Sequence, residues 1–132
     1  MVCVRDSRLL CVELRDPLTR AARLFVPGGA VEPGETPAQA AAREAWEETG
    51  YRVRVYESRA EIARYPYTWS GQTRDVTTHF FHAELVDPAG EPAPVRDADY
   101  NEGVRWLALA DIPDALGFQP EILAAIVRLL PP

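Results

Sequence analysis

The chain has 132 residues, 47% of them apolar, which is the size and composition of one globular domain covering residues 1–132. Its net charge of −6 argues against nucleic-acid polymers and anionic membrane surfaces as partners. The opening residues carry Arg5, Asp6 and Arg8 and so lack the apolar core of a signal peptide, and no apolar run approaches the roughly 20 residues of a membrane span. We therefore expect a cytoplasmic protein that does not bind a membrane.

Two cysteines, Cys3 and Cys11, lie in apolar segments near the N-terminus. Nothing else in the sequence suggests secretion, and disulfides are rare in reducing compartments. Both are therefore interpreted as reduced thiols in the core rather than as a disulfide pair.

The pattern of apolar runs and turn residues predicts a single α/β domain with a mixed sheet. The expected strands are residues 2–4, 9–14, 24–26, 52–55, 57–65, 76–86 and 104–109. Two segments are expected to be loops: the aromatic-rich residues 65–75 and the long acidic residues 87–103. A short helical turn at residues 110–116 and an amphipathic helix at residues 120–130 complete the expected elements.

The best-signalled element is a helix that begins after Thr36 and ends at Gly50. Thr36 is suited to be its N-cap, Pro37 takes the first helical position, and Gln39 completes a capping box. A glycine is the usual residue that ends a helix in the left-handed conformation. Small residues recur at helical spacing and predict close packing on a sheet: Ala38, Ala41, Ala42, Ala45 and Thr49.

This helix carries three acids, Glu44, Glu47 and Glu48, one turn or less apart. Like charges at these spacings destabilise a helix by roughly a few tenths of a kcal/mol per pair, unless a cation lies among them. Clustered carboxylates are the ligands that Mg²⁺ or Mn²⁺ prefers, although a solvated acidic helix face would have the same composition. The preceding Gly28-Gly29 favours a ligand site, because bare backbone leaves room for a substrate's phosphates or a metal.

The whole stretch resembles the signature of the Nudix hydrolase family. The resemblance covers the 23 residues from Gly29 to Tyr51 and includes Glu35 and the run Arg-Glu-Ala-Trp-Glu-Glu-Thr-Gly-Tyr that starts at Arg43. It implies an α/β/α sandwich with a mixed sheet. It also implies Mg²⁺-dependent hydrolysis, with Mn²⁺ as the alternative ion, of a nucleoside diphosphate linked to another group: a nucleoside triphosphate, a dinucleoside polyphosphate or an ADP-ribose-type compound.

Matching positions also imply roles for individual residues. Metal binding is implied for three helix glutamates and one loop carbonyl: Glu44, Glu47, Glu48 and Gly28. Arg43 would pair with Glu35 and fix the loop against the helix. A catalytic carboxylate, Glu47 or Glu102, would take the proton of the attacking water. Three acids near Glu102 compete with it for that role: Glu91, Asp97 and Asp99.

Substrate-binding candidates follow the signature. Tyr65, Tyr67 and Trp69 alternate along the chain and would either stack on a nucleobase, with Arg74 nearby contacting phosphate or base, or pack inside the protein. Pro66 followed by Tyr67 satisfies the family's markers for both ADP-ribose and dinucleoside polyphosphate hydrolases, so the substrate is left open.

The two histidines of the chain do not form a metal site. His79 and His82 are three residues apart on a strand, so they point to opposite faces and are interpreted as structural.

A non-catalytic Nudix-like module that binds a nucleotide is the alternative function, but such relatives usually lack signature glutamates that are all present here. The oligomeric state is also left open, although a homodimer is common in the family.

Overall fold

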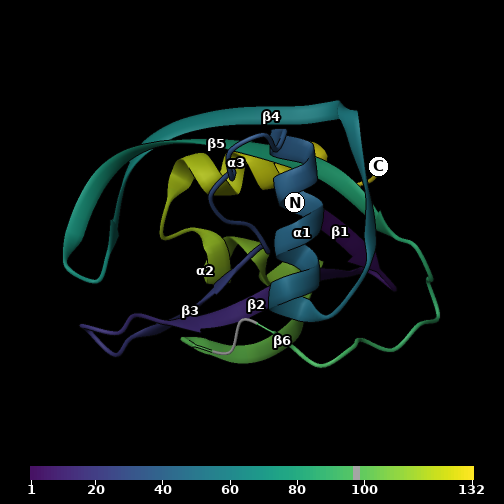
Figure 1. Ribbon diagram of the computed structural model, residues 1–132, viewed down its shortest axis with the longest axis horizontal. Helices are drawn as coiled ribbons and strands as arrows, with labels where there is room; N and C mark the ends of the chain where they lie inside the picture. The colour runs from purple at the N-terminus through teal and green to yellow at the C-terminus, as the bar shows by residue number, and fades with distance from the viewer. Residues whose placement is uncertain (97–98) are drawn as a thin grey trace.

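The computed structural model describes residues 1–96 and 99–132 and contains six strands with helices on both faces (Figure 1). The strands are β1 (Val2–Arg5), β2 (Arg8–Arg15), β3 (Ala22–Phe25), β4 (Val53–Trp69), β5 (Gln72–Leu85) and β6 (Asn101–Ala108). The helices are α1 (Pro37–Thr49), α2 (Ile112–Leu116), which follows a 3₁₀ turn at Leu109–Asp111, and α3 (Pro120–Leu129). Among the described helices, none is long and apolar enough to cross a membrane.

The strand order is β3-β2-β1-β5-β4, with β6 on the other edge of β2. β1 and β5 are parallel and the other pairs are antiparallel, so the predicted mixed sheet is confirmed. β1 pairs with β5 at Val2 and Cys3. On one edge of β2, β1 is the neighbour of the first residues, and β3 is the neighbour from Val12 onward. Beyond the start of β1, the described pairings do not join β2 and β3 to β4 and β5, and a cavity lies between these two halves.

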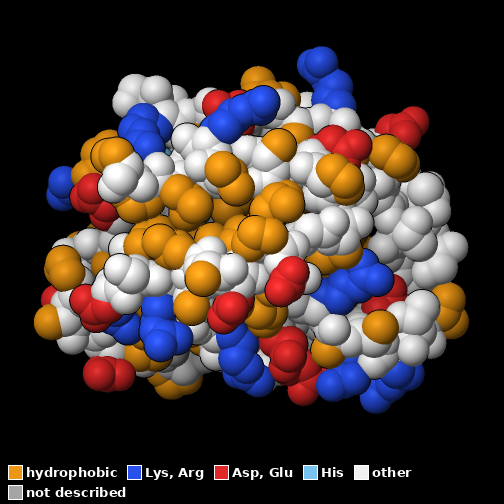
Figure 2. Space-filling model, turned by 180° about the vertical axis from the view of Figure 1, so that it is seen from behind, with side chains coloured by type: hydrophobic (Ala, Val, Ile, Leu, Met, Phe, Trp, Pro, Cys, Tyr) orange, Lys and Arg blue, Asp and Glu red, His pale blue; other side chains and the backbone are white. Residues whose placement is uncertain are grey.

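The helices cover opposite faces of the sheet, as expected for an α/β/α sandwich. On one face, the small residues of α1 pack into a core cluster with residues of β1, β2 and β5, among them Leu10 and Phe81. On the other, α2 and α3 bury residues such as Leu116 and Ile126. Figure 2, seen from behind, shows apolar side chains gathered near the middle of that view, with charged side chains around them.

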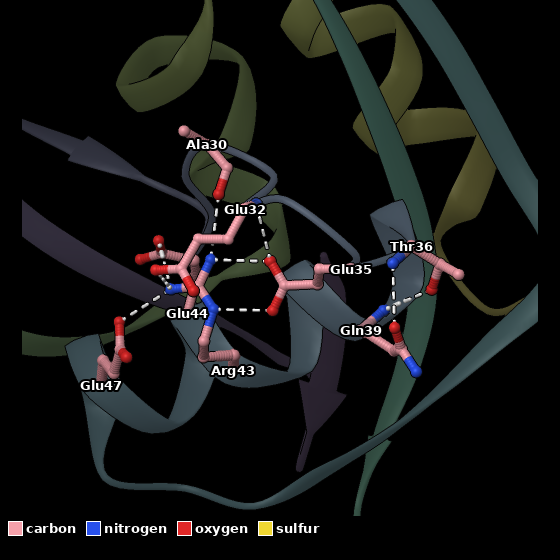
Figure 3. A network of polar contacts seen from close by, with 8 residues as sticks. All are labelled: Ala30, Glu32, Glu35, Thr36, Gln39, Arg43, Glu44 and Glu47. Atoms are coloured by element: carbon pink, nitrogen blue, oxygen red, sulfur yellow. Dashed lines mark hydrogen bonds and ion pairs between the residues drawn. The ribbon is translucent and has the colours of Figure 1, made fainter.

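The capping signals of α1 are confirmed. The side chain of Thr36 accepts a hydrogen bond from the backbone of Gln39, and the side chain of Gln39 accepts one from the backbone of Thr36 (Figure 3). Gly50 ends the helix at φ +74°. A β-carbon there would also collide with the carbonyl oxygen of Ala93, so glycine lets the loop after β5 close over the end of α1.

Both cysteines are free and buried, which confirms that they form no disulfide. Burial raises the pKa of Cys3 to about 11 and that of Cys11 to about 12. The thiols therefore stay protonated at neutral pH and are poor nucleophiles.

Four predicted boundaries were wrong, and one of them is the start of β6, which lies at Asn101, three residues earlier than expected and inside the segment predicted as a loop. Residues 52–55 and 57–65 are one strand, β4, with an irregular register between Tyr56 and Ala60 rather than a break. Residues 65–75 are not a loop but the end of a hairpin, because Tyr65 to Trp69 pairs with residues 72–76 and only Ser70 and Gly71 form the turn. Both turn residues have positive φ, as two-residue hairpin turns require. β3 starts two residues earlier than expected and ends at Phe25.

Candidate active site

The loop between β3 and α1 lies on the carboxylates of α1. The backbone N–H of Gly28 donates a hydrogen bond of 2.8 Å to Oε1 of Glu48, whose residue is 4% exposed. A β-carbon on Gly29 would lie 2.5 Å from the carboxylate carbon of Glu44. Glycine is thus needed at position 29 because a carboxylate occupies the space of a side chain, not because of its backbone angle.

Arg43 is the centre of the polar network in Figure 3. Its guanidinium binds both carboxylate oxygens of Glu35, through Nε at 2.8 Å and Nη2 at 3.0 Å, and Nη2 also donates to the carbonyl of Ala30. On the other side, Nη1 donates to Glu44 at 2.9 Å and to Glu47 at 3.0 Å. One side chain therefore ties the loop to two of the three helix glutamates.

The contacts of Arg43 shift the pKa values of the groups that it joins. The pKa of Glu35 is lowered, first by its hydrogen bonds from Arg43 and then by the N–H of Glu32. In turn, the hydrogen bonds to Glu35 and then to Glu44 raise the pKa of Arg43 above its usual value. The guanidinium of Arg43 thus offsets part of the like-charge repulsion expected among the glutamates of α1.

The helix glutamates supply the hard oxygen donors that Mg²⁺ and Mn²⁺ take, and their environments differ. Glu48 is buried beside Gly28, the side chain of Glu44 is 13% exposed, and that of Glu47 is 35% exposed. Among the described residues, no three acidic, histidine or cysteine side chains are gathered as a ready-made metal group. The donor chemistry fits a divalent cation, while the carboxylates of Glu44 and Glu47 are directed to Arg43.

The candidates for a second catalytic carboxylate lie around the start of β6. Glu102 accepts a 2.6 Å hydrogen bond from Arg15, which also donates to the carbonyl of Arg20. Asp97 lies outside the described residues, and the other two candidates, Glu91 and Asp99, are exposed. Next to Glu102, Asn101 donates to the backbone carbonyl of Glu48 at 2.8 Å. No sequence pattern predicts this contact, which holds the start of β6 against the end of α1.

A cavity of about 480 Å³, here called the large cavity, lies between the two halves of the sheet and has the buried carboxylate of Glu48 in its lining. Its lining includes five predicted site residues: Gly28, Gly29, Glu48, Tyr65 and Tyr67. His79, interpreted from the sequence as structural, lines it as well. The hydroxyl of Tyr65 is bonded to that of Thr78 at 2.9 Å.

The remaining two substrate-binding candidates lie elsewhere. Trp69 lines a second cavity of about 260 Å³, here called the outer cavity. Arg74 is exposed on the hairpin, where it donates to Gln72. Sequence reasoning missed Phe25 and Phe118, which line both cavities and whose ring centroids are 5.5 Å apart. Phe25 could have been proposed from the sequence, because it is an aromatic residue inside a predicted strand. Phe118 follows a short helix, and no sequence pattern marks it.

Residues 1–128 match the NUDIX domain model, so the chain belongs to the Nudix family of hydrolases. It is 31% identical over 130 residues to a MutT-like protein of Streptomyces ambofaciens, covering 98% of this chain and 71% of that protein. It is 33% identical over 97 residues to a CMP-5'-(N-acetyl-N-hydroxy-3-aminopropyl)phosphonate hydrolase of Streptomyces rubellomurinus, covering 69% of this chain and 40% of that one. A NUDIX hydrolase from Nitrosomonas europaea has a similar structure, with a TM-score of 0.69 and 26% identity over 96% of this chain and 82% of the other.

Proposed function

We propose that the protein is a pyrophosphohydrolase that cleaves a nucleoside diphosphate linked to another moiety, using Mg²⁺ or, as the alternative, Mn²⁺. One observation carries the proposal: the Gly28-Gly29 loop lies on the carboxylates of Glu44 and Glu48 at the end of a cavity that is large enough for a nucleoside. Carboxylates and open backbone at the mouth of an aromatic-lined cavity suit a substrate with a charged diphosphate and an apolar ring.

The cation would be held by carboxylate and carbonyl oxygens: Glu44, Glu47, Glu48 and the carbonyl of Gly28. When bound, it would offset the negative charge of the diphosphate and lower the pKa of a bound water. The chain's own residues position these ligands. The N–H of Gly28 orients the buried carboxylate of Glu48, and Arg43 holds Glu44 and Glu47 on one side of the helix.

We place the general base at Glu47, with Glu102 as the alternative. Glu47 is the more exposed of the signature glutamates and lies one residue from Glu48, so it can reach both the site and solvent. Both carboxylates are ion-paired, and the 2.6 Å contact of Glu102 with Arg15 is shorter than the 3.0 Å contact of Glu47 with Arg43.

The nucleoside would occupy the large cavity, where Tyr65, Tyr67 and Phe118 supply aromatic surface. A relative whose name specifies a CMP-linked phosphonate supports a nucleotide joined to a second group. Nucleoside triphosphates, dinucleoside polyphosphates and ADP-ribose-type compounds all have the required chemistry. We infer that small-molecule nucleotides are the partners and that the protein acts in the cytoplasm, whereas the homodimer stays an open prediction.

The test is hydrolysis of a panel of nucleoside diphosphate derivatives with Mg²⁺ or Mn²⁺, with products separated by chromatography. We expect at least one compound to be cleaved at a phosphoric anhydride bond and the activity to disappear when the metal is chelated. Tight nucleotide binding without turnover of any compound would instead support a binding module and overturn the proposal.

A further inference from the structure

The large cavity borders the outer cavity on the side away from Glu48, which lines only the large one. The two share four lining residues: Leu14, Phe25, Tyr67 and Phe118. Three of these are aromatic, and the ring of Phe25 meets those of Tyr67 and Phe118 edge-on. Going away from the signature glutamates, the large cavity comes first, then these aromatic residues, here called the aromatic boundary, and then the outer cavity.

Arg23 lines the outer cavity beside this boundary. It lies two residues before Phe25 on β3, so the two side chains share a face of the strand. Its guanidinium carbon is 4.8 Å from the ring centroid of Phe118, which holds the cation over an aromatic face. Its charge also opposes the increase in the pKa of Tyr67, which burial raises to about 12.

The N–H groups of Arg23 are available to a ligand. Within the described part of the chain, the contacts of this side chain are with the ring of Phe118 and not with a carboxylate. The acid that lines the same cavity, Asp16, already accepts hydrogen bonds from the backbone of Leu18, Thr19 and Ser70. A guanidinium carries five N–H donors and no acceptor, so a group with two adjacent acceptors is its natural partner.

Among the described residues that line the large cavity there is no arginine, lysine, asparagine or glutamine. Its polar side chains, in the described residues, are Glu48, Tyr65, Tyr67, Thr77, Thr78 and His79. The hydroxyls of Tyr65 and Thr78 are bonded to each other, and Glu48 lies at the end where the diphosphate is proposed to bind. Arginine and glutamine side chains, which read purine edges elsewhere, line the outer cavity at Arg23 and Gln119.

We propose that Arg23 is a specificity-determining residue that reads the outer edge of the base bound in the large cavity and selects 6-oxopurines over adenine. Guanine and hypoxanthine present O6 and N7 as adjacent acceptors, which an arginine binds with two parallel N–H groups. Adenine presents a donor amino group in place of O6 and would face the guanidinium with like polarity. The inference rests on the proposed function, because it needs the base to lie between the carboxylates and the outer cavity.

The experiment compares kcat/KM for GTP, ITP and ATP in the wild type and in Arg23→Met, which keeps an unbranched side chain on Phe118 but removes the donors. The wild type should prefer GTP and ITP over ATP by roughly tenfold, mainly through KM, as a good two-bond contact to a base allows. Arg23→Met should bring the ratio close to one with kcat little changed. Arg20→Met, an exposed arginine that lines neither cavity, is the matched control and should keep the wild-type ratio.

Binding of GMP, IMP and AMP, measured by calorimetry with the same three proteins, tests the subsite without turnover. GMP and IMP should bind more tightly than AMP, and Arg23→Met should remove the difference. Hydrolysis without a preference for 6-oxopurines, or a preference that survives in Arg23→Met, would overturn this inference and leave the proposed function intact. Absence of hydrolysis with preserved GMP selectivity would overturn the proposed function alone, and equal or absent binding of all three would overturn the inference.

Discussion

At the scale of single residues, the signature positions have distinct physical reasons. Gly29 makes room for the carboxylate of Glu44, Arg43 connects the loop to the helix, and Glu48 holds the backbone of Gly28 from a buried position. The three glutamates are therefore not equivalent, and substitutions at each should fail in different ways.

Glu48→Gln should lower kcat by at least about a hundredfold while the protein folds normally. The amide oxygen can still accept the hydrogen bond from Gly28, but the charge that would hold the cation is lost. Turnover assays with Mg²⁺ and thermal melting in its absence measure the two effects separately. Activity like that of the wild type would refute the metal role of Glu48.

Gly29→Ala should reduce activity with a small effect on stability. The added β-carbon displaces the far end of a flexible side chain, the carboxylate of Glu44, rather than backbone. Gly28→Ala is the comparison, because a β-carbon there meets no atom within 4 Å. We expect the loss of kcat/KM in Gly29→Ala to exceed that in Gly28→Ala, and equal losses would contradict the steric explanation.

At the scale of elements, the signals that were local in the sequence predicted most. The limits of α1 follow from Thr36, Pro37 and Gly50, which act within one turn of the helix, and they were correct. The hairpin at residues 65–75 was missed because its turn and aromatic residues are also typical of loops. The pairs at the end of the hairpin lie close in sequence, from Tyr65 with Val76 to Trp69 with Gln72, so the Ser70-Gly71 turn was a local signal that the prediction overlooked.

Asp16 connects two of these elements and gives a test by pH. Its carboxylate accepts N–H groups from Leu18 and Thr19 in the β2–β3 loop and from Ser70 at the tip of the β4–β5 hairpin. These bonds, that of Ser70 first, lower the pKa of Asp16 in the folded protein. The stabilisation is therefore complete above the unfolded pKa and is lost as the pH falls toward the folded one.

Asp16→Asn should lower Tm by about 4 °C at pH 7, since the amide is a weaker acceptor without charge. The difference from the wild type should shrink as the pH falls below 4, where the carboxylate takes up a proton first in the unfolded chain and, at lower pH, in the folded protein. Melting curves from pH 7 to pH 3 measure this convergence. A difference that stays constant over this range would show that the charge of Asp16 does not stabilise the loop and the hairpin.

At the scale of the whole molecule, the fold class could be predicted but the shape of the binding region could not. The signature predicted the sandwich and placed Gly28, Gly29 and Glu48 together. The outer part of the site depends on where β1 gives way to β3 along β2, which opens a space between the two halves of the sheet. Phe25 of β3 and Phe118, which follows α2, both line this space, and strand register is not readable from composition.

Mg²⁺ should raise Tm, because the ligands come together in the folded chain and not in the unfolded one. At a concentration about ten times its dissociation constant, the increase should be about 4 °C for a chain of this size. Thermal melting with millimolar MgCl₂ measures it, and Glu48→Gln is the control in which the increase should be lost. A wild-type Tm that is insensitive to Mg²⁺ would count against the proposed metal ligands.

The position of Arg43 among the acids also bears on the order in which the chain folds and binds the proposed cation. Many small metal-binding domains are unfolded until the ion arrives, since nothing else holds their ligands together. Here a guanidinium serves as a built-in counter-ion for Glu35, Glu44 and Glu47. We therefore expect the chain to fold before the proposed cation binds, with Arg43 as the counter-ion of these acids until then.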